Sequence, residues 1–219
     1  MSVLDNPKVH RVLEREHGRA EGDSERLASI RDKIDAAKAA GTFTYDMYPT
    51  DVYLAIEPAM GRFLNLCTRS LDAKCIVEFG TSFGISTIYL AAAARETGGR
   101  VVGSELEPSK AERAQANLEE AGLADVVEIR VGDAMQTLQE LDGSVDLLFL
   151  DGWKDLYVPV TQLLEGKLRH GAVVLADNIH TFKAEIQAYV DYMARQDGPF
   201  HSVTLPFESG LHYSYYHKP

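Results

Sequence analysis

From residue 75 onward, the chain alternates short apolar runs with longer amphipathic segments. The apolar, β-prone runs predict strands at 75–79, 100–104, 126–131, 145–150 and 172–176. The segments between these runs repeat apolar residues at helical spacing. Strands that alternate with helices pair in parallel, and helices cover both faces of the resulting sheet. Two further runs, at 200–205 and 211–217, flank a turn-rich link and predict a hairpin that adds an antiparallel edge to this α/β core.

The first seventy residues show only helical spacing. One apolar repeat runs over 27–37 and a second over 53–67. A chain of 219 residues is long enough for one sizeable core. We therefore expect one domain over 1–219, in which 1–70 forms a helical cap over the ligand-binding edge of the sheet and 71–219 forms the core.

The charge balance narrows the class of partner. The chain has 33 acidic and 22 basic residues and a formal net charge of −11, which disfavours binding to nucleic acid or to an anionic membrane. No apolar run approaches membrane-spanning length, and the first residues do not form a signal peptide. Cys67 and Cys75 lie in apolar surroundings without a CxxC partner. These features favour buried reduced thiols and a cytoplasmic protein.

Two predicted strands end abruptly in polar residues. Asp151 closes one apolar run and is followed by Lys154, and Asp177 with Asn178 closes the next run. The carboxyl ends of parallel strands are where open α/β sheets bind ligands. Oxygen ligands at two neighbouring strand ends suit a hard cation, although polar residues after a strand are also common in plain turns.

Three earlier strand ends also carry acids. Glu78 closes the first strand, beside Gly80 and Gly84 in a turn that leads to a helix N-terminus. Glu105 stands about twenty residues further on, where an acid accepts hydrogen bonds from a ribose. Asp133 closes the third strand and suits an adenine amino group. Each feature alone is more often structural, but together they describe a nucleoside that carries an amino acid and no pyrophosphate, which is S-adenosylmethionine (SAM).

Two downstream runs carry a resemblance to a known family. The runs are FLDGWKDLYVP over 149–159 and LRHGAVVLADN over 168–178. With the acids above, they resemble class I SAM-dependent methyltransferases, and within these the metal-dependent catechol O-methyltransferase and caffeoyl-CoA O-methyltransferase family. The resemblance covers about residues 75–180. It implies a Rossmann-like fold with a mostly parallel seven-stranded sheet and an antiparallel C-terminal hairpin strand.

The resemblance extends the expected cofactor site. Ser82 and Ser86 fall where the family contacts the methionine end of SAM, together with the glycines of the turn. Ala134 follows Asp133 on the adenine side. Trp153 either packs on the adenine or fills the core.

The acceptor pocket is where the chain departs from the family pattern. Tyr45 and Met47 match aromatic and methionine positions at the mouth of the active site, and Glu208 matches an acid directed at the second substrate hydroxyl. Gly152 stands where catechol enzymes often carry a larger side chain. His180 lies where a proline is expected, and it is either a further active-site group or a surface residue.

Methyl transfer from a sulfonium to oxygen explains why these residue types occur together. A phenolic hydroxyl has a pKa of about 10, so it is rarely ionised at neutral pH. A magnesium ion, or another divalent cation, on Asp151, Asp177 and Asn178 would lower that pKa and orient two vicinal hydroxyls. Lys154 is the expected general base, because burial near a cation lowers the pKa of its ammonium group. An exposed lysine at a helix start is the alternative.

The predicted function is divalent-cation-dependent methylation of a hydroxyl on a small catechol-like aromatic acceptor. The expected partner is an aromatic diol, with no nucleic acid or membrane, and the chain is a candidate homodimer. One alternative is the same fold acting on a larger natural-product scaffold or an RNA base. Another is a SAM-binding interaction protein without catalysis.

Overall fold

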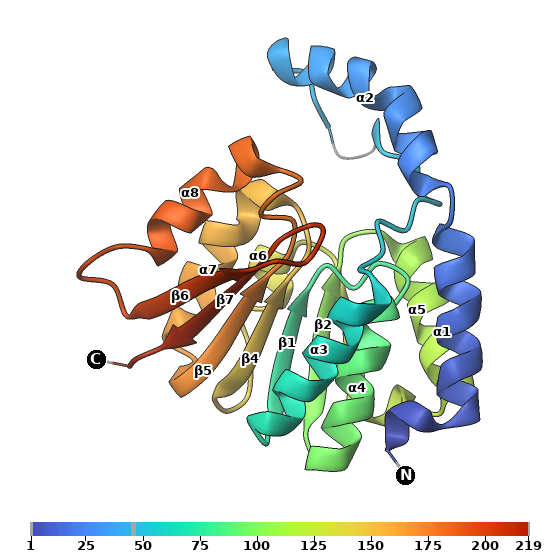
Figure 1. Ribbon diagram of the computed structural model, residues 1–219, viewed down its shortest axis with the longest axis vertical. Coiled ribbons are helices and arrows are strands. Elements are labelled where there is room, and N and C mark those ends of the chain that lie inside the picture. The colour runs from blue at the N-terminus through green and yellow to red at the C-terminus, as the bar shows by residue number, and fades with distance from the viewer. Residues whose placement is uncertain (1, 45–46, 219) are drawn as a thin grey trace.

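A seven-stranded sheet forms the centre of the computed structural model, which describes residues 2–44 and 47–218 apart from the side chain of Ser24 (Figure 1). The strands are β1 (Cys75–Phe79), β2 (Arg100–Glu105), β3 (Val127–Val131), β4 (Val145–Leu150), β5 (Leu168–Ala176), β6 (Phe200–Leu205) and β7 (Leu211–Tyr216). Their order is β3-β2-β1-β4-β5-β7-β6, and only the pairs β5–β7 and β6–β7 are antiparallel. The predicted Rossmann-like sheet with its C-terminal hairpin is confirmed.

Helices cover both faces of the sheet (Figure 1). They are α1 (Pro7–Ala20), α2 (Asp23–Ala39), α3 (Pro58–Ser70), α4 (Ile85–Thr97), α5 (Pro108–Ala121), α6 (Ala134–Thr137), α7 (Tyr157–Glu165) and α8 (Lys183–Met193), with short 3-10 turns η1 (Val3–Asp5), η3 (Ala124–Val126) and η4 (Lys154–Leu156). Alternation along β1 separates two cores. Ile76 packs in the cluster that contains residues of α1, α3, α4 and α5. Val77 packs in the cluster of α6, α7 and α8, as the two-residue period of a strand requires.

The N-terminal helices are arranged differently from the expected cap. α1 and α3 pack against α4, and α1 also packs against α5, so both cover a face of the sheet rather than its carboxyl edge. α2 alone projects above the body of the molecule (Figure 1). Its Lys38 Nζ lies 3.1 Å from Glu185 Oε1 of α8. α3 begins at Pro58, five residues after the apolar stripe starts, because the proline supplies the first helical position.

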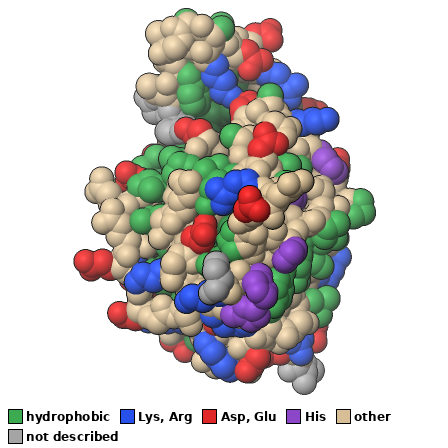
Figure 2. All heavy atoms as spheres, turned by 90° about the vertical axis from the view of Figure 1, so that its left-hand side faces the viewer, with side chains coloured by type: hydrophobic (Ala, Val, Ile, Leu, Met, Phe, Trp, Pro, Cys, Tyr) green, Lys and Arg blue, Asp and Glu red, His purple; other side chains and the backbone are tan. Residues whose placement is uncertain are grey.

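One of the two free edges of the sheet is β6. This strand exposes His201, Ser202 and Thr204 together with Val203, which is 55% exposed. Figure 2 views the molecule from this side and shows histidine side chains gathered there. One pair is formed by His170 and His217, whose rings lie 4.8 Å apart. Over the described ranges, no helix combines the length and the apolar character needed to cross a membrane.

Candidate active site

The strand order brings the carboxyl ends of β1, β4 and β5 together. β1 lies between β2 and β4, so the chain reverses its direction of progress across the sheet at this point, where such sheets bind ligands. The Asp151 N–H donates to the Phe79 carbonyl at 2.8 Å, and the Asp177 N–H donates to the Leu150 carbonyl at 3.0 Å. The acids predicted from three strands therefore lie along one edge.

Two glycines allow the ends of β1 and β4 to approach closely. Gly80 has φ +99°, and a Cβ there would lie 2.7 Å from the Gly152 nitrogen. A Cβ on Gly152 would lie 2.5 Å from the Phe79 ring. The departure from the family at position 152 therefore has a local cause, because the Phe79 ring fills the space that a larger side chain would need.

Glu78 is fully buried and bound by neighbouring hydroxyl groups. Its Oε1 accepts a hydrogen bond from Ser86 Oγ at 2.6 Å, and its Oε2 accepts from Thr87 Oγ1 at 2.5 Å and Thr81 Oγ1 at 3.1 Å. Burial raises the pKa of Glu78 to about 7, although the three hydroxyls oppose that shift. A nearby cation would favour the ionised form of a carboxyl group whose pKa lies near neutrality.

The loop after β1 is hydrogen-bonded to Glu105 at the end of β2. Ser82 has the left-handed φ of 49°, and its N–H donates to Glu105 Oε2 at 2.7 Å. The other oxygen, Oε1, accepts from the Glu107 N–H at 2.9 Å. A Cβ on Gly84 would lie 3.1 Å from the Ala114 Cβ, so this glycine permits the approach of α5. The predicted members Glu78, Ser82 and Glu105 thus share one loop region.

Asp133 and Ala134 lie at the start of α6. Asp133 caps this helix, and its Oδ1 accepts from the Met135 N–H at 2.9 Å. Its side chain is exposed, whereas Ala134 is buried. The Gly132 N–H donates to the Glu105 carbonyl at 2.8 Å, which places the end of β3 beside that of β2.

Asp151 and Lys154 form a shielded pair at the start of η4. Lys154 Nζ lies 3.6 Å from Asp151 Oδ1, and the two side chains are 11% and 12% exposed. The same ammonium group donates to the Gly152 carbonyl at 2.9 Å and to Tyr157 Oη at 2.7 Å. Burial raises the pKa of Asp151, and the nearby Asp177 raises it further. Burial lowers the pKa of Lys154, against the attraction of both carboxylates.

Asp177 completes the cluster and is held by its predicted neighbour Asn178 and by Ser209, which the sequence pattern did not indicate. Its Oδ1 accepts from Ser209 Oγ at 2.5 Å and from the Asn178 N–H at 2.6 Å. The Tyr157 hydroxyl donates to the Asp177 carbonyl at 3.4 Å. Asn178 has the left-handed φ of 70°, which asparagine tolerates well. Burial raises the pKa of Asp177 despite these donors.

The chemistry of this donor set fits a divalent cation. In the described parts of the chain, no three or more His, Cys, Asp and Glu side chains are grouped so as to hold a metal. The predicted set is different in kind, because it has two carboxylates and one amide. The charge of Asp177 raises the pKa of Asp151, whose side chain is 12% exposed, and Asp177 itself is buried. A cation between such groups removes the electrostatic penalty, and Mg²⁺ prefers oxygen ligands.

The remaining predicted residues lie around this edge. The ring of Trp153 lies 5.0 Å from that of Tyr48. Tyr45 lies outside the described residues. The Met47 N–H donates to the Thr44 carbonyl at 3.1 Å.

The loop between β6 and β7 approaches the end of β5. Glu208 is exposed, and its N–H donates to Glu57 Oε1 at 3.3 Å. The His180 N–H donates to the Ser209 carbonyl at 2.8 Å, and its ring packs against Gly210. His180 is therefore an exposed residue that helps to fix this loop beside Asp177.

The strand order and the acids at successive strand ends define a class I methyltransferase. A family model described as a methyltransferase domain matches residues 77–179. A catechol O-methyltransferase of Mycobacterium tuberculosis is 42% identical over 58% of this chain and 57% of its own length, so the match spans little more than half of that relative. A catechol O-methyltransferase of Sus scrofa is 32% identical over 70% of this chain and 83% of the relative.

A solved structure has the same architecture over most of its length. The O-methyltransferase TomG from Streptomyces achromogenes, in complex with SAM, has a TM-score of 0.69 and 28% identity, covering 86% of this chain and 89% of TomG. The chain belongs to the SAM-dependent O-methyltransferase family that includes the catechol and caffeoyl-CoA O-methyltransferases.

Proposed function

We propose that this protein transfers a methyl group from SAM to a hydroxyl of a small catechol-like aromatic acceptor, with help from Mg²⁺ or another divalent cation. One observation carries the proposal: Asp151, Lys154 and Asp177 form a shielded cluster at the strand ends. This cluster lies beside the loop that follows β1, which is hydrogen-bonded to Glu105. The unit of function in this proposal is one domain over 1–219, in which 1–70 contributes helices α1 to α3.

In this proposal, different residues bind different parts of the SAM molecule. Glu78 faces the ammonium group, and Ser86 fixes the carboxylate of Glu78 through a hydrogen bond at 2.6 Å. Glu105 accepts hydrogen bonds from the ribose hydroxyls, and Ser82 donates its N–H to Glu105 and so sets its orientation. Gly80 and Gly84 allow the backbone approaches that shape this loop.

The proposed adenine contacts come from the residues after β3 and from Trp153, which directly precedes η4. Asp133 and Ala134 lie at the end of β3, beside the end of β2 that carries Glu105. The half-buried Trp153 offers a ring to the base.

Asp151, Asp177 and Asn178 would hold the divalent cation. When bound, such an ion lowers the pKa of a phenolic hydroxyl and orients two vicinal oxygens. Ser209 then acts as a positioning residue, because its hydroxyl holds Asp177 Oδ1 at 2.5 Å. Glu208, the neighbour of Ser209, and Met47 remain candidates for contact with the acceptor, as does Tyr45.

Lys154 takes the proton in the proposed reaction. The acceptor oxygen attacks the methyl carbon as the carbon–sulfur bond breaks, and its proton passes to Lys154 Nζ. The products are the methyl ether and S-adenosylhomocysteine. Burial favours the neutral amine that such a base needs, and the bonds to Gly152 and Tyr157 hold the Nζ atom in place.

A larger natural-product acceptor is the second candidate. TomG, the SAM-bound structural relative, is described as involved in tomaymycin synthesis. The acceptor side of this chain also departs from the catechol pattern at Gly152. An RNA acceptor is disfavoured by the net charge of −11, and a protein without catalysis has no chemical need for a buried lysine beside two acids.

A single experiment separates these candidates. The purified protein is incubated with isotopically labelled SAM and a panel of catechols, lone phenols and larger phenolic scaffolds, with Mg²⁺ or with a chelator. We expect methylation of vicinal diols that chelation abolishes and Mg²⁺ restores. Full activity in chelator would contradict the metal proposal, and SAM binding without methylation of any acceptor would favour the interaction protein.

A further inference from the structure

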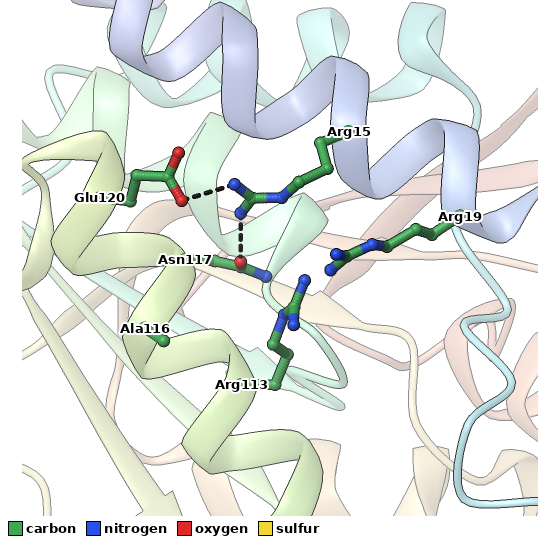
Figure 3. A pocket seen from close by; sticks show the side chains of 6 residues that line it. All are labelled: Arg15, Arg19, Arg113, Ala116, Asn117 and Glu120. Atoms are coloured by element: carbon green, nitrogen blue, oxygen red, sulfur yellow. Dashed lines mark hydrogen bonds and ion pairs between the residues drawn. The ribbon is translucent and has the colours of Figure 1, made fainter.

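Three arginines line a pocket of about 220 Å³ between α1 and α5 (Figure 3). Arg15 and Arg19 come from successive turns of α1, and Arg113 comes from α5. Figure 3 shows the guanidinium groups of all three converging on the space between the helices. No residue proposed above for methyl transfer lines this pocket.

The cluster carries an excess of positive charge. Glu16, which is fully buried, accepts hydrogen bonds from Arg15 Nε at 2.7 Å, Arg19 Nη1 at 3.2 Å and Arg113 Nη2 at 2.9 Å. Glu120 pairs with Arg15 Nη1 at 2.5 Å. Three guanidinium groups thus face two carboxylates, and one positive charge is left over. This occurs in a chain whose net charge is −11, so the pocket differs in sign from the protein around it.

Two of the arginines have donors to spare. Arg15 uses Nε, Nη1 and Nη2 in bonds to Glu16, Glu120 and Asn117. Arg19 and Arg113 each bond to Glu16 through one nitrogen, although a guanidinium has several N–H donors. The Nε–H of Arg113 is buried, and no described residue accepts its hydrogen bond. A buried donor without an acceptor is destabilising, so Glu16 alone does not satisfy the guanidinium group of Arg113.

We propose that Arg15, Arg19 and Arg113 form a binding site for a small phosphate-bearing anion, separate from the methyl-transfer site. A carboxylate has two coplanar oxygens, which one guanidinium satisfies. A phosphate has oxygens in tetrahedral directions, so it can meet guanidinium groups that approach from two helices. The pocket volume exceeds the volume of a phosphate group, so a phosphomonoester with a small organic part fits the same site.

The test is a titration of the full-length protein with inorganic phosphate at constant ionic strength, balanced with chloride. The ¹H–¹⁵N signals of the arginine Nε groups report where the anion binds. We expect saturable shifts for Arg15, Arg19 and Arg113. Glycerol phosphate should shift the same signals, and acetate should not. Shifts that are unsaturable or spread over all arginines would overturn the site, and acetate binding as tightly as phosphate would overturn its assignment to phosphate.

Substitutions test the same site in the intact chain. Arg113→Gln and Arg19→Gln should each weaken phosphate binding about tenfold or more, because each removes a charge-assisted interaction. Arg31→Gln, at an exposed arginine of α2, is the matched control and should leave the affinity unchanged. Arg19 is 45% exposed, so its variant remains informative if loss of Arg113 disturbs folding around Glu16. Equal affinity of the Arg19 variant and the wild type would contradict the proposal.

Discussion

Two groups of buried acids lie along the same sheet edge, and they are stabilised in different ways. Glu78, at the end of β1, is surrounded by three hydroxyl donors. At the end of β4, Asp151 lies 3.6 Å from Lys154, and the charge of Asp177, at the end of β5, raises the pKa of both side chains. Burial raises the pKa in both groups. Neutral hydroxyl donors fill the hydrogen-bonding positions of Glu78, whereas the second group has two carboxylates and only one ammonium group.

This difference indicates what each side of the site requires. A carboxylate with hydroxyl donors can stay in place with or without a ligand, so the proposed cofactor side is preorganised. Two carboxylates that repel each other are stabilised by a cation of charge greater than that of one lysine. The comparison therefore predicts that changes on the β4–β5 side affect metal dependence, and changes on the β1 side affect SAM.

The largest expected effect comes from Asp177→Ala. The substitution removes one of two carboxylates from the proposed cation site, so Mg²⁺-dependent methyl transfer should fall at least about a thousandfold. SAM affinity should stay close to the wild-type value, because Asp177 lies on the β5 side of the edge. The measurements are steady-state turnover over a range of Mg²⁺ concentrations and calorimetric titration with SAM. Turnover like that of the wild type would show that the cation binds elsewhere.

Lys154→Ala should have the next largest effect. Loss of a general base lowers turnover by about a hundredfold, while SAM and Mg²⁺ affinities change little. Burial lowers the pKa of Lys154, so the neutral base forms as the pH rises through that lowered value. The wild-type rate should therefore rise with pH and then level off, and the variant should lack this rise. Lys154→Arg is the matched control, because it keeps the charge but does not lose a proton. Full activity in the arginine variant would exclude the proposed role.

The contrast between the two sides also explains what the sequence could predict. The donors to Glu78 come from residues 81, 86 and 87, so one strand–turn–helix unit contains the whole arrangement. The strands and the acids at their ends follow from period and apolar pattern in the same way. The strands, and the place of Glu78 at a strand end, could therefore be predicted from the sequence, whereas the donors Thr81 and Thr87 were not predicted.

The other side depends on contacts between distant segments. Ser209 bonds to Asp177 across 32 positions, and it does so because the β6–β7 hairpin returns beside β5. Serine in a turn is too common to indicate such a contact. The packing of α1 on α5 through Glu16 could not be predicted from the sequence either. A buried glutamate is recognised only when the fold brings its three arginine partners together.

A third test concerns Glu78 and its pH dependence. Its pKa is raised from 4.5 to about 7, so the wild-type carboxyl gains its charge as the pH rises through 7. In the proposed site the SAM ammonium group faces Glu78 and prefers its charged form, so wild-type affinity should increase between pH 6 and 8 by roughly tenfold. Glu78→Gln should show a weaker, nearly flat affinity over that range. Calorimetric titration at each pH measures both curves, and a parallel rise in the variant would assign the titration to another group.

The stability of the same variant tests independently whether the pKa of Glu78 is raised or lowered in the fold. A carboxyl with a raised pKa is neutral in the fold at a pH where it is already charged in the unfolded chain, so the fold loses stability as the pH rises from 4.5 towards 7. Glu78→Gln should escape this loss. As the pH rises over that interval, the free energy of unfolding of the variant should increase relative to that of the wild type by about 3 kcal/mol. Denaturant unfolding at each pH measures this difference.

The smallest expected effects come from a matched pair of hydroxyl deletions. Ser209→Ala removes the donor 2.5 Å from Asp177, and Thr87→Val removes the donor 2.5 Å from Glu78. The first should weaken Mg²⁺ activation about tenfold without changing SAM affinity, because loss of a supporting hydrogen bond would disturb a proposed metal ligand. The second should weaken SAM binding by a few fold and leave Mg²⁺ activation unchanged. If either variant altered both quantities equally, the two groups of acids would act as one coupled network, and the separation of a preorganised cofactor side from a cation-dependent side would fail.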